Sequence, residues 1–96
     1  MNIRVEHNGA EVTELFEEQI QTKVGKLEHH YNTIVDAIVF LHEERKEKQV
    51  ELKIMVKDET LFVKESSDTF LNALEASVKA MDIRLKKYKE QALKNI

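Results

Sequence analysis

Clustered basic side chains are the residues of this sequence whose type and spacing suggest a chemical role, and that role is the binding of phosphate groups. The whole 96-residue chain has a formal charge of −3, yet the part from position 79 onward carries +4, which leaves −7 for residues 1–78. Cations near the end of a helix also complement its dipole, which is a sufficient explanation for any single lysine. The cluster as a whole indicates binding of a polyanion. Its cations are Lys79, Arg84, Lys86, Lys87, Lys89 and Lys94.

A second group of cations lies earlier in the chain. Lys23 and Lys26 are about one helical turn apart, beside an apolar stripe. On the last helix, Arg84 and Lys87 share one flank. If that flank faced Lys23 and Lys26, the two helices would form a single basic groove, and phosphate backbones bind such grooves. We therefore predict a basic groove between two helices.

The four histidines do not suggest a metal site. His29 and His30 are adjacent on a helix and diverge by about 100°, while His7 and His42 are isolated at strand ends. A zinc site needs three or four converging ligands, and the chain has no cysteine. With two glycines it also has no nucleophile elbow and no phosphate-binding loop. We expect no metal, no cofactor, no small-molecule substrate and no enzymatic activity.

Length and composition indicate one domain, formed by residues 1–96. The absence of cysteine is typical of a reducing compartment. No apolar run approaches the ~20 residues of a membrane span, and the N-terminus has no signal-peptide pattern. A cytoplasmic protein that contacts no membrane is expected. The negative total charge argues mildly against nucleic-acid binding, although the distribution of charge matters more than its sum.

Hydrophobic periodicity predicts six elements. Residues 2–7, 50–56 and 60–64 alternate as strands do, and residues 34–41 form the apolar run of a central strand. A helix with Thr13 as N-cap is expected over residues 12–31, and a second helix over residues 69–94. On the second helix, Lys79 and Lys86 are expected on the outer face. The charged stretch 42–49 is interpreted as the end of a strand and an exposed hairpin connection.

The order β-α-β-β-β-α predicts an α+β fold, with a four-stranded sheet and two helices packed on one face. The helix stripes begin at Val12 and Phe70 and close one core against the sheet. The other sheet face, with Glu51, Lys53 and Lys57, is expected to be wet. Gly25 lies inside the first helix at a cost of about 1 kcal/mol relative to alanine, and a close approach of another backbone is one explanation for it.

This order of elements resembles the ribosome hibernation promoting factors, also known as ribosome-associated inhibitors or sigma-54 modulation proteins. The similarity covers the whole chain, in the short form of the family. It rests on residues 12–14 (VTE), 23–28 (KVGKLE), 60–65 (TLFVKE) and 85–89 (LKKYK). The resemblance implies a cytoplasmic, stationary-phase stress factor that binds the small ribosomal subunit. It would contact 16S rRNA, with ribosomal proteins as further partners, in the channel for mRNA and tRNA, and so inhibit translation.

Family positions that face rRNA fall on Lys23 and Lys26 of the first helix and on Lys86, Lys87 and Lys89 of the second. With Arg84, which stands where the family commonly has glutamine, these are the candidate rRNA-binding residues. The chain departs from the family at Ala80 and Ile83, where the family usually has Lys or Arg, and Asp82 adds a negative charge between them. Each phosphate contact that is lost reduces the slope of log K against log salt by about one unit. We therefore expect weaker rRNA binding than in other members of the family.

An alternative is a protein-interaction module that keeps this fold and has lost ribosome binding. Its partner surface would combine the acidic start of the first helix with the charged hairpin and the exposed Ile83. Binding of phosphates should weaken steeply with salt, whereas a contact centred on Ile83 should not. Double-stranded RNA binding is less favoured because no glycine-bearing or lysine-dense loop precedes the last helix.

Overall fold

The structure is a computed structural model that describes residues 1–94, and the side chains of residues 1–92. The predicted order of elements is confirmed, although each of the last three strands extends three residues further into the polar stretches than expected. The elements are β1 (Asn2–Asn8), α1 (Glu14–His30), β2 (Ile34–Glu44), β3 (Glu47–Val56), β4 (Thr60–Ser67) and α2 (Phe70–Lys94).

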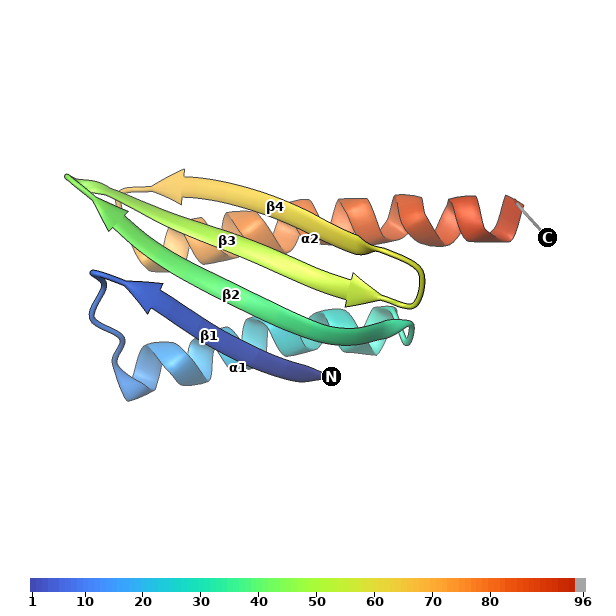
Figure 1. Cartoon of the computed structure of the whole chain (residues 1–96), viewed down its shortest axis with the longest axis horizontal. Helices are drawn as coiled ribbons and strands as arrows, with labels where there is room; N and C mark the ends of the chain where they lie inside the picture. Colours follow the sequence, from blue (N-terminus) through green and yellow to red (C-terminus); the bar gives the residue numbers. More distant parts are fainter. Residues whose placement is uncertain (95–96) are drawn as a thin grey trace.

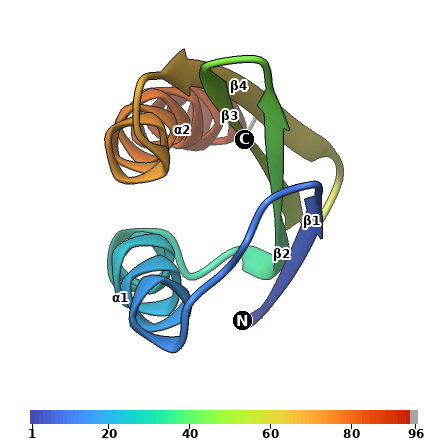
Figure 2. The ribbon, with the colours of Figure 1, turned by 90° about the vertical axis from the view of Figure 1, so that its left-hand side faces the viewer.

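The four strands form one mixed sheet in the order β1-β2-β3-β4. Strand β1 pairs with β2 in parallel, and the other neighbours are antiparallel. Figure 1 shows the two helices running along the length of the sheet, and Figure 2 shows both of them on the same face, side by side. The predicted α+β architecture, with both helices on one face, is therefore correct.

The core fills the space between the two helices and the inner face of the sheet. Alternate residues of each strand point to this face, so that Val5, Val39, Leu52 and Val63 form one row across all four strands. The helices contribute the predicted stripes, together with Ala73 and Ser77, which the stripe did not include. The fully buried side chains on the helices include Ile20, Val24, Leu74, Ser77, Met81 and Leu85.

Ser77 is buried without leaving a polar group unpaired. Its hydroxyl donates to the carbonyl of Leu74 at 2.7 Å, one turn earlier in α2. An unpaired buried hydroxyl costs about 1–3 kcal/mol, so this local bond makes the position tolerable.

The outer face of the sheet is less polar than expected. One row across it consists of Arg4, Ile38, Lys53 and Phe62, so cations and apolar side chains alternate. Ile38 is only 8% exposed although it lies outside the main core, whereas Phe62 is 45% exposed. The long cationic side chains beside it explain this burial, because their aliphatic parts cover neighbouring apolar surface.

Threonine side chains cap the N-termini of both helices. Thr13 Oγ1 accepts from the amide of Phe16 at 3.1 Å, as predicted, and Thr69 Oγ1 accepts from the amide of Asn72 at the same distance. Each bond satisfies one amide that the helix itself leaves free. At Gly25, in contrast, an added Cβ would meet nothing within 4 Å, so close approach of another backbone does not explain this glycine.

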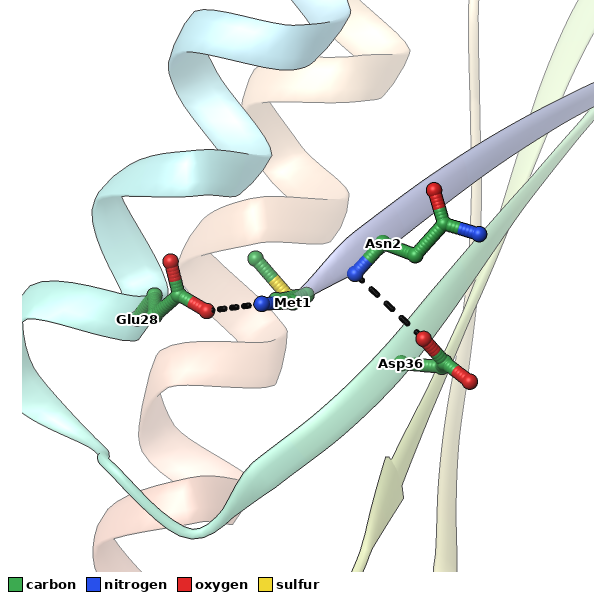
Figure 3. Close-up of polar contacts among 4 residues, drawn as sticks. All are labelled: Met1, Asn2, Glu28 and Asp36. Carbon is green, nitrogen blue, oxygen red and sulfur yellow. Dashed lines mark hydrogen bonds and ion pairs between the residues drawn. The ribbon is translucent and has the colours of Figure 1, made fainter.

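Strand β1 is held to the rest of the fold by polar contacts near its start. The amino group of Met1 forms an ion pair with Glu28 near the end of α1, and the carboxylate of Asp36 accepts from the amide of Asn2 at 3.3 Å (Figure 3). The side-chain amide of Gln21 on α1 also donates to the carbonyl of Ile3 at 3.2 Å. These contacts are solvent-exposed, so they orient the strand more than they stabilise it.

The β2–β3 connection is a two-residue turn formed by Arg45 and Lys46, between the paired residues Glu44 and Glu47. Arg45 has a φ of 57°, and it is the one non-glycine residue in the described part of the chain with positive φ. This left-handed conformation costs a residue with a Cβ about 1–2 kcal/mol. Glycine adopts this conformation without that cost, but it also raises the conformational entropy of the unfolded chain, which lowers the free energy of unfolding.

We predict that Arg45→Gly raises the free energy of unfolding by a few tenths to about 1 kcal/mol, because glycine removes the conformational cost. Lys46→Gly is the matched control. It should lower the free energy of unfolding, since Lys46 is not in the left-handed region and gains only unfolded-state entropy. Urea unfolding followed by circular dichroism measures both. Equal losses of stability in the two variants would show that the turn conformation carries no cost.

Candidate nucleic-acid interface

A groove of about 320 Å³ lies between α1 and α2 and brings together three lysines. Lys23 and Lys26 come from the second half of α1, and Lys79 comes from the middle of α2. Leu27 and Val78 form its apolar floor. The two helices lie side by side on the sheet, so residues on their facing flanks converge. The remaining residues of the groove are His30, Glu75 and Asp82.

Two carboxylates reduce the positive charge of this groove. Lys23 Nζ lies 3.7 Å from Glu75 Oε2, and both side chains are partly exposed to solvent. Asp82 lines the groove about two turns further along α2 than Glu75. An exposed pair of this kind contributes at most about 1 kcal/mol, so Lys23 can exchange Glu75 for a phosphate group at low cost. The groove therefore has a small net positive charge, with mobile cations.

Arg84 and Lys87 do not face this groove, which corrects the prediction that they would join Lys23 and Lys26. They lie on the opposite flank of α2, around a hollow that also includes Ile83 and residues near β4. The physical reason is the rotation of α2. Its flank toward α1 is formed by positions 75, 78 and 82, and positions 84 and 87 are turned away from that flank. Only one flank of α2 can face α1.

The guanidinium of Arg84 has a structural partner in this position. Its Nη1 donates to the backbone carbonyl of Phe62 on β4 at 3.1 Å. Arg84 remains exposed, and a guanidinium has five N–H donors, so this bond leaves donors free for a phosphate. Ile83 is 58% exposed beside it, as the sequence predicted.

The remaining predicted cations lie outside the groove between α1 and α2 and outside the hollow beside β4. Lys89 lines a hollow at the end of the molecule where both helices finish, together with Lys57 and two tyrosines. Lys86 is exposed, and none of the hollows described here includes it. The side chain of Lys94 lies outside the described residues.

Two lysines of these hollows were not among the candidate residues. Lys79 was predicted on the outer face of the helix, and Lys57 on the wet face of the sheet. Lys79 follows Glu75 by four residues and precedes Asp82 by three, and this spacing could have placed it in the groove. No comparable signal exists for Lys57, because its position depends on the turn between β3 and β4.

Two tyrosines bridge elements toward the ends of the helices. The hydroxyl of Tyr31, at the end of α1, donates to the carbonyl of Asp82 on α2 at 3.2 Å. The hydroxyl of Tyr88 donates to Asp58 Oδ2 at 3.5 Å. Desolvation raises the pKa of Tyr31, and the negative charge of Asp82 and Glu90 raises it further. The pKa of Tyr88 is raised by desolvation and by Asp58 and Glu59.

The described residues contain no group of three or more histidine, aspartate or glutamate side chains that could hold a metal ion. Within the same part of the chain, neither helix is long and apolar enough to cross a membrane. Exposed cations lie at three places, which are the groove between the helices, the hollow beside β4 and the hollow near the helix ends. Exposed cations of this kind suit the binding of phosphate groups.

Comparisons with known proteins give one family. A family model described as Sigma 54 modulation protein / S30EA ribosomal protein matches residues 3–92. No curated protein matches the sequence. Among solved structures, a ribosomal subunit interface protein from Coxiella burnetii has 18% identity and a TM-score of 0.85, and covers 94% of this chain and 99% of its own. The N-terminal domain of Protein Y from Thermus thermophilus has 20% identity and a TM-score of 0.83, with coverages of 92% and 99%. At these identities the likeness shows the fold.

We predict that Tyr31→Phe lowers the free energy of unfolding by about 1 kcal/mol at pH 7, because it removes the bond between the helices. The unfolded phenol loses its proton near pH 10, before the folded one, whose pKa is raised. The contribution of the phenol is therefore complete below about pH 10 and falls as the pH rises above it. Urea unfolding at several pH values should show the difference between wild type and Tyr31→Phe shrinking above about pH 10. A constant difference would contradict the role given to the phenol.

Proposed function

The chain belongs to the Sigma 54 modulation protein / S30EA ribosomal protein family, whose members are ribosome-associated and not enzymes, and we propose that it is a ribosome hibernation factor. In this proposal it binds the small ribosomal subunit through 16S rRNA, in the channel used by mRNA and tRNA. It inhibits translation by occupying that channel under stress or in stationary phase, in the cytoplasm. Residues 1–96 act as one ribosome-binding domain.

The observation that carries this proposal is the basic groove between α1 and α2. Lys23, Lys26 and Lys79 converge there from two helices, and lysine side chains bind phosphates as mobile point charges. Electrostatic contacts with phosphates supply affinity without reading a base sequence. The proposed rRNA-binding residues are Lys23, Lys26, Arg84, Lys86, Lys87 and Lys89, and we add Lys79 because it lines the same groove as Lys23 and Lys26.

The net charge of −3 is compatible with this proposal because basic residues outnumber acidic ones in the second half of α2, whereas the start of α1 is acidic. Glu14, Glu17 and Glu18 lie in the first turns of α1, whereas the lysine-rich half of α2 lies at the far end. Figure 1 shows the start of α1 and the ends of both helices at opposite ends of the long axis, which measures 47 Å. This separation orients the basic end toward a polyanion.

A second candidate function is protein interaction without ribosome binding, and the exposure of Ile83 favours it. This side chain is 58% exposed and lies in the hollow between α2 and β4, with Leu61 and Tyr88. An exposed apolar side chain in a hollow suits a contact with another protein. Such a contact would respond weakly to salt, and this response separates it from phosphate binding.

We predict that the double variant Lys23→Ala/Lys26→Ala loses affinity for small ribosomal subunits and has a flatter salt dependence. The slope of log K against log salt should decrease by about one unit for each phosphate that the variant no longer neutralises. Co-sedimentation with purified small subunits at several salt concentrations measures both quantities.

Lys46→Ala/Lys64→Ala is the matched control, because it removes the same charge from the hairpin turn and from the outer face of the sheet. It should leave the slope unchanged. Equally weakened binding in the two double variants would indicate a general charge effect and contradict the groove as the binding site. Wild-type protein that stays at the top of the gradient at low salt would contradict ribosome binding itself.

We also predict that Asp82→Asn tightens binding to the small subunit by about two- to fivefold at low salt. Asp82 lines the groove with three lysines, and removing its charge lowers repulsion of phosphate by a few tenths to about 1 kcal/mol. Glu18→Gln, at the acidic end of α1, is the control and should have no effect. Co-sedimentation again provides the measurement, and an unchanged affinity for Asp82→Asn would place the groove outside the interface.

A further inference from the structure

A second hollow lies beyond the helix groove, at the end of the molecule where the α1–β2 connection, the β3–β4 turn and the last turns of α2 meet. It measures about 300 Å³ and is mainly apolar. This volume is at the lower end of the range of small-molecule sites, so it fits one planar group and not a larger ligand. The residues that matter for its chemistry are His30, Tyr31, Lys57, Asp58, Tyr88 and Lys89.

Two tyrosine rings give this hollow its apolar character. Tyr31 and Tyr88 are partly exposed, and their hydroxyls are bound by the carbonyl of Asp82 and the carboxylate of Asp58. The bond of Tyr31, at 3.2 Å, tethers its ring to α2, whereas the contact of Tyr88 with Asp58, at 3.5 Å, is long for a bond between two oxygens and holds its ring less firmly. A fixed aromatic ring with an accessible surface is a platform on which a nucleobase stacks.

The hollow itself is lined by two lysines and one aspartate, which gives its wall a small net positive charge, although Glu59, Asp82 and Glu90 lie close enough to the tyrosine hydroxyls to add to the desolvation that raises their pKa. Lys57 and Lys89 are exposed and come from two different elements, the β3–β4 turn and α2. Asp58 is the only acidic residue among the described residues that line the hollow, and it is engaged by Tyr88. A planar aromatic group that carries a phosphate matches both the rings and the lysines.

We propose that this hollow binds one unpaired nucleotide of ribosomal RNA, with its base against Tyr31 and Tyr88 and its phosphate between Lys57 and Lys89. The inference rests on the proposed function and deepens it, because it adds a contact with a base to contacts with the backbone. It also gives Lys89 a role that is separate from the groove lysines.

A single-stranded hexa-adenylate RNA serves as the probe in a nuclear magnetic resonance titration of the full chain. The amide resonances of Tyr31, Lys57 and Tyr88 should shift, and Tyr88→Leu should weaken binding about tenfold through loss of the stacking surface. Tyr88→Phe keeps the stacking surface and loses only the contact with Asp58, so it should bind more tightly than Tyr88→Leu. Phe62→Leu, which removes an exposed aromatic ring from the outer face of the sheet, is the matched control and should have no effect.

Lys57→Ala tests the phosphate contact without affecting the core, because Lys57 is exposed. It should weaken binding of the hexamer severalfold, and it keeps the proposal testable if Tyr88→Leu is poorly folded. Resonance shifts that avoid the hollow, or equal binding by wild type, Tyr88→Leu and Lys57→Ala, would overturn the nucleotide site.

Co-sedimentation with small subunits separates this inference from the proposed function. Weaker binding by Tyr88→Leu and Lys57→Ala than by Tyr88→Phe supports a contact with ribosomal RNA. Equal binding by all variants overturns the role of the hollow and leaves the proposed function intact. Failure of wild type to bind small subunits overturns the proposed function, and the ribosomal RNA contact with it.

Discussion

The structure depends on one packing constraint, which is that two helices must cover a single face of a four-stranded sheet. The inner face is apolar along all four strands, and each helix meets it with a stripe whose central side chains are fully buried. Burying one such side chain contributes about 1.5–3 kcal/mol, so neither helix can rotate without a large loss of stability. The rotation of each helix is therefore fixed by its core residues, and the positions of the polar residues follow from it.

This constraint divides the basic residues of α2 among different surfaces. Lys79 faces α1 across the groove, Arg84 and Lys87 face the side of β4, and Lys89 reaches the hollow at the end of the helices. Cations that point in different directions cannot all contact one straight RNA duplex. They can contact RNA that surrounds the end of the protein on several sides, as the walls of a channel do. Division of the charge is thus consistent with occupation of a channel and less consistent with docking on a flat surface.

The sequence contained most of the fold and only part of the candidate site. The helix stripes, the strand alternation and the Thr13 cap are local patterns, and all were confirmed.

The groove was predicted between the correct helices and with Lys23 and Lys26, but Arg84 and Lys87 were wrongly included in it. Which flank of α2 faces α1 depends on the lateral order of the helices over the sheet, and periodicity within one helix does not contain that information. Lys57 reaches its hollow through a turn between strands, which is a tertiary effect. Contacts of the basic residues with rRNA stay predictions.

Two bonds from helix side chains to strand carbonyls protect the edges of the sheet against aggregation. Strands β1 and β4 are the outer strands of the sheet, and each has a carbonyl bound by a helix side chain, Ile3 by Gln21 and Phe62 by Arg84. An outer strand with free backbone groups is a template on which another chain can add a strand and begin aggregation. Here the occupied carbonyls would first have to be released. Arg84 therefore protects the sheet edge against addition of a further strand, besides being a candidate phosphate ligand.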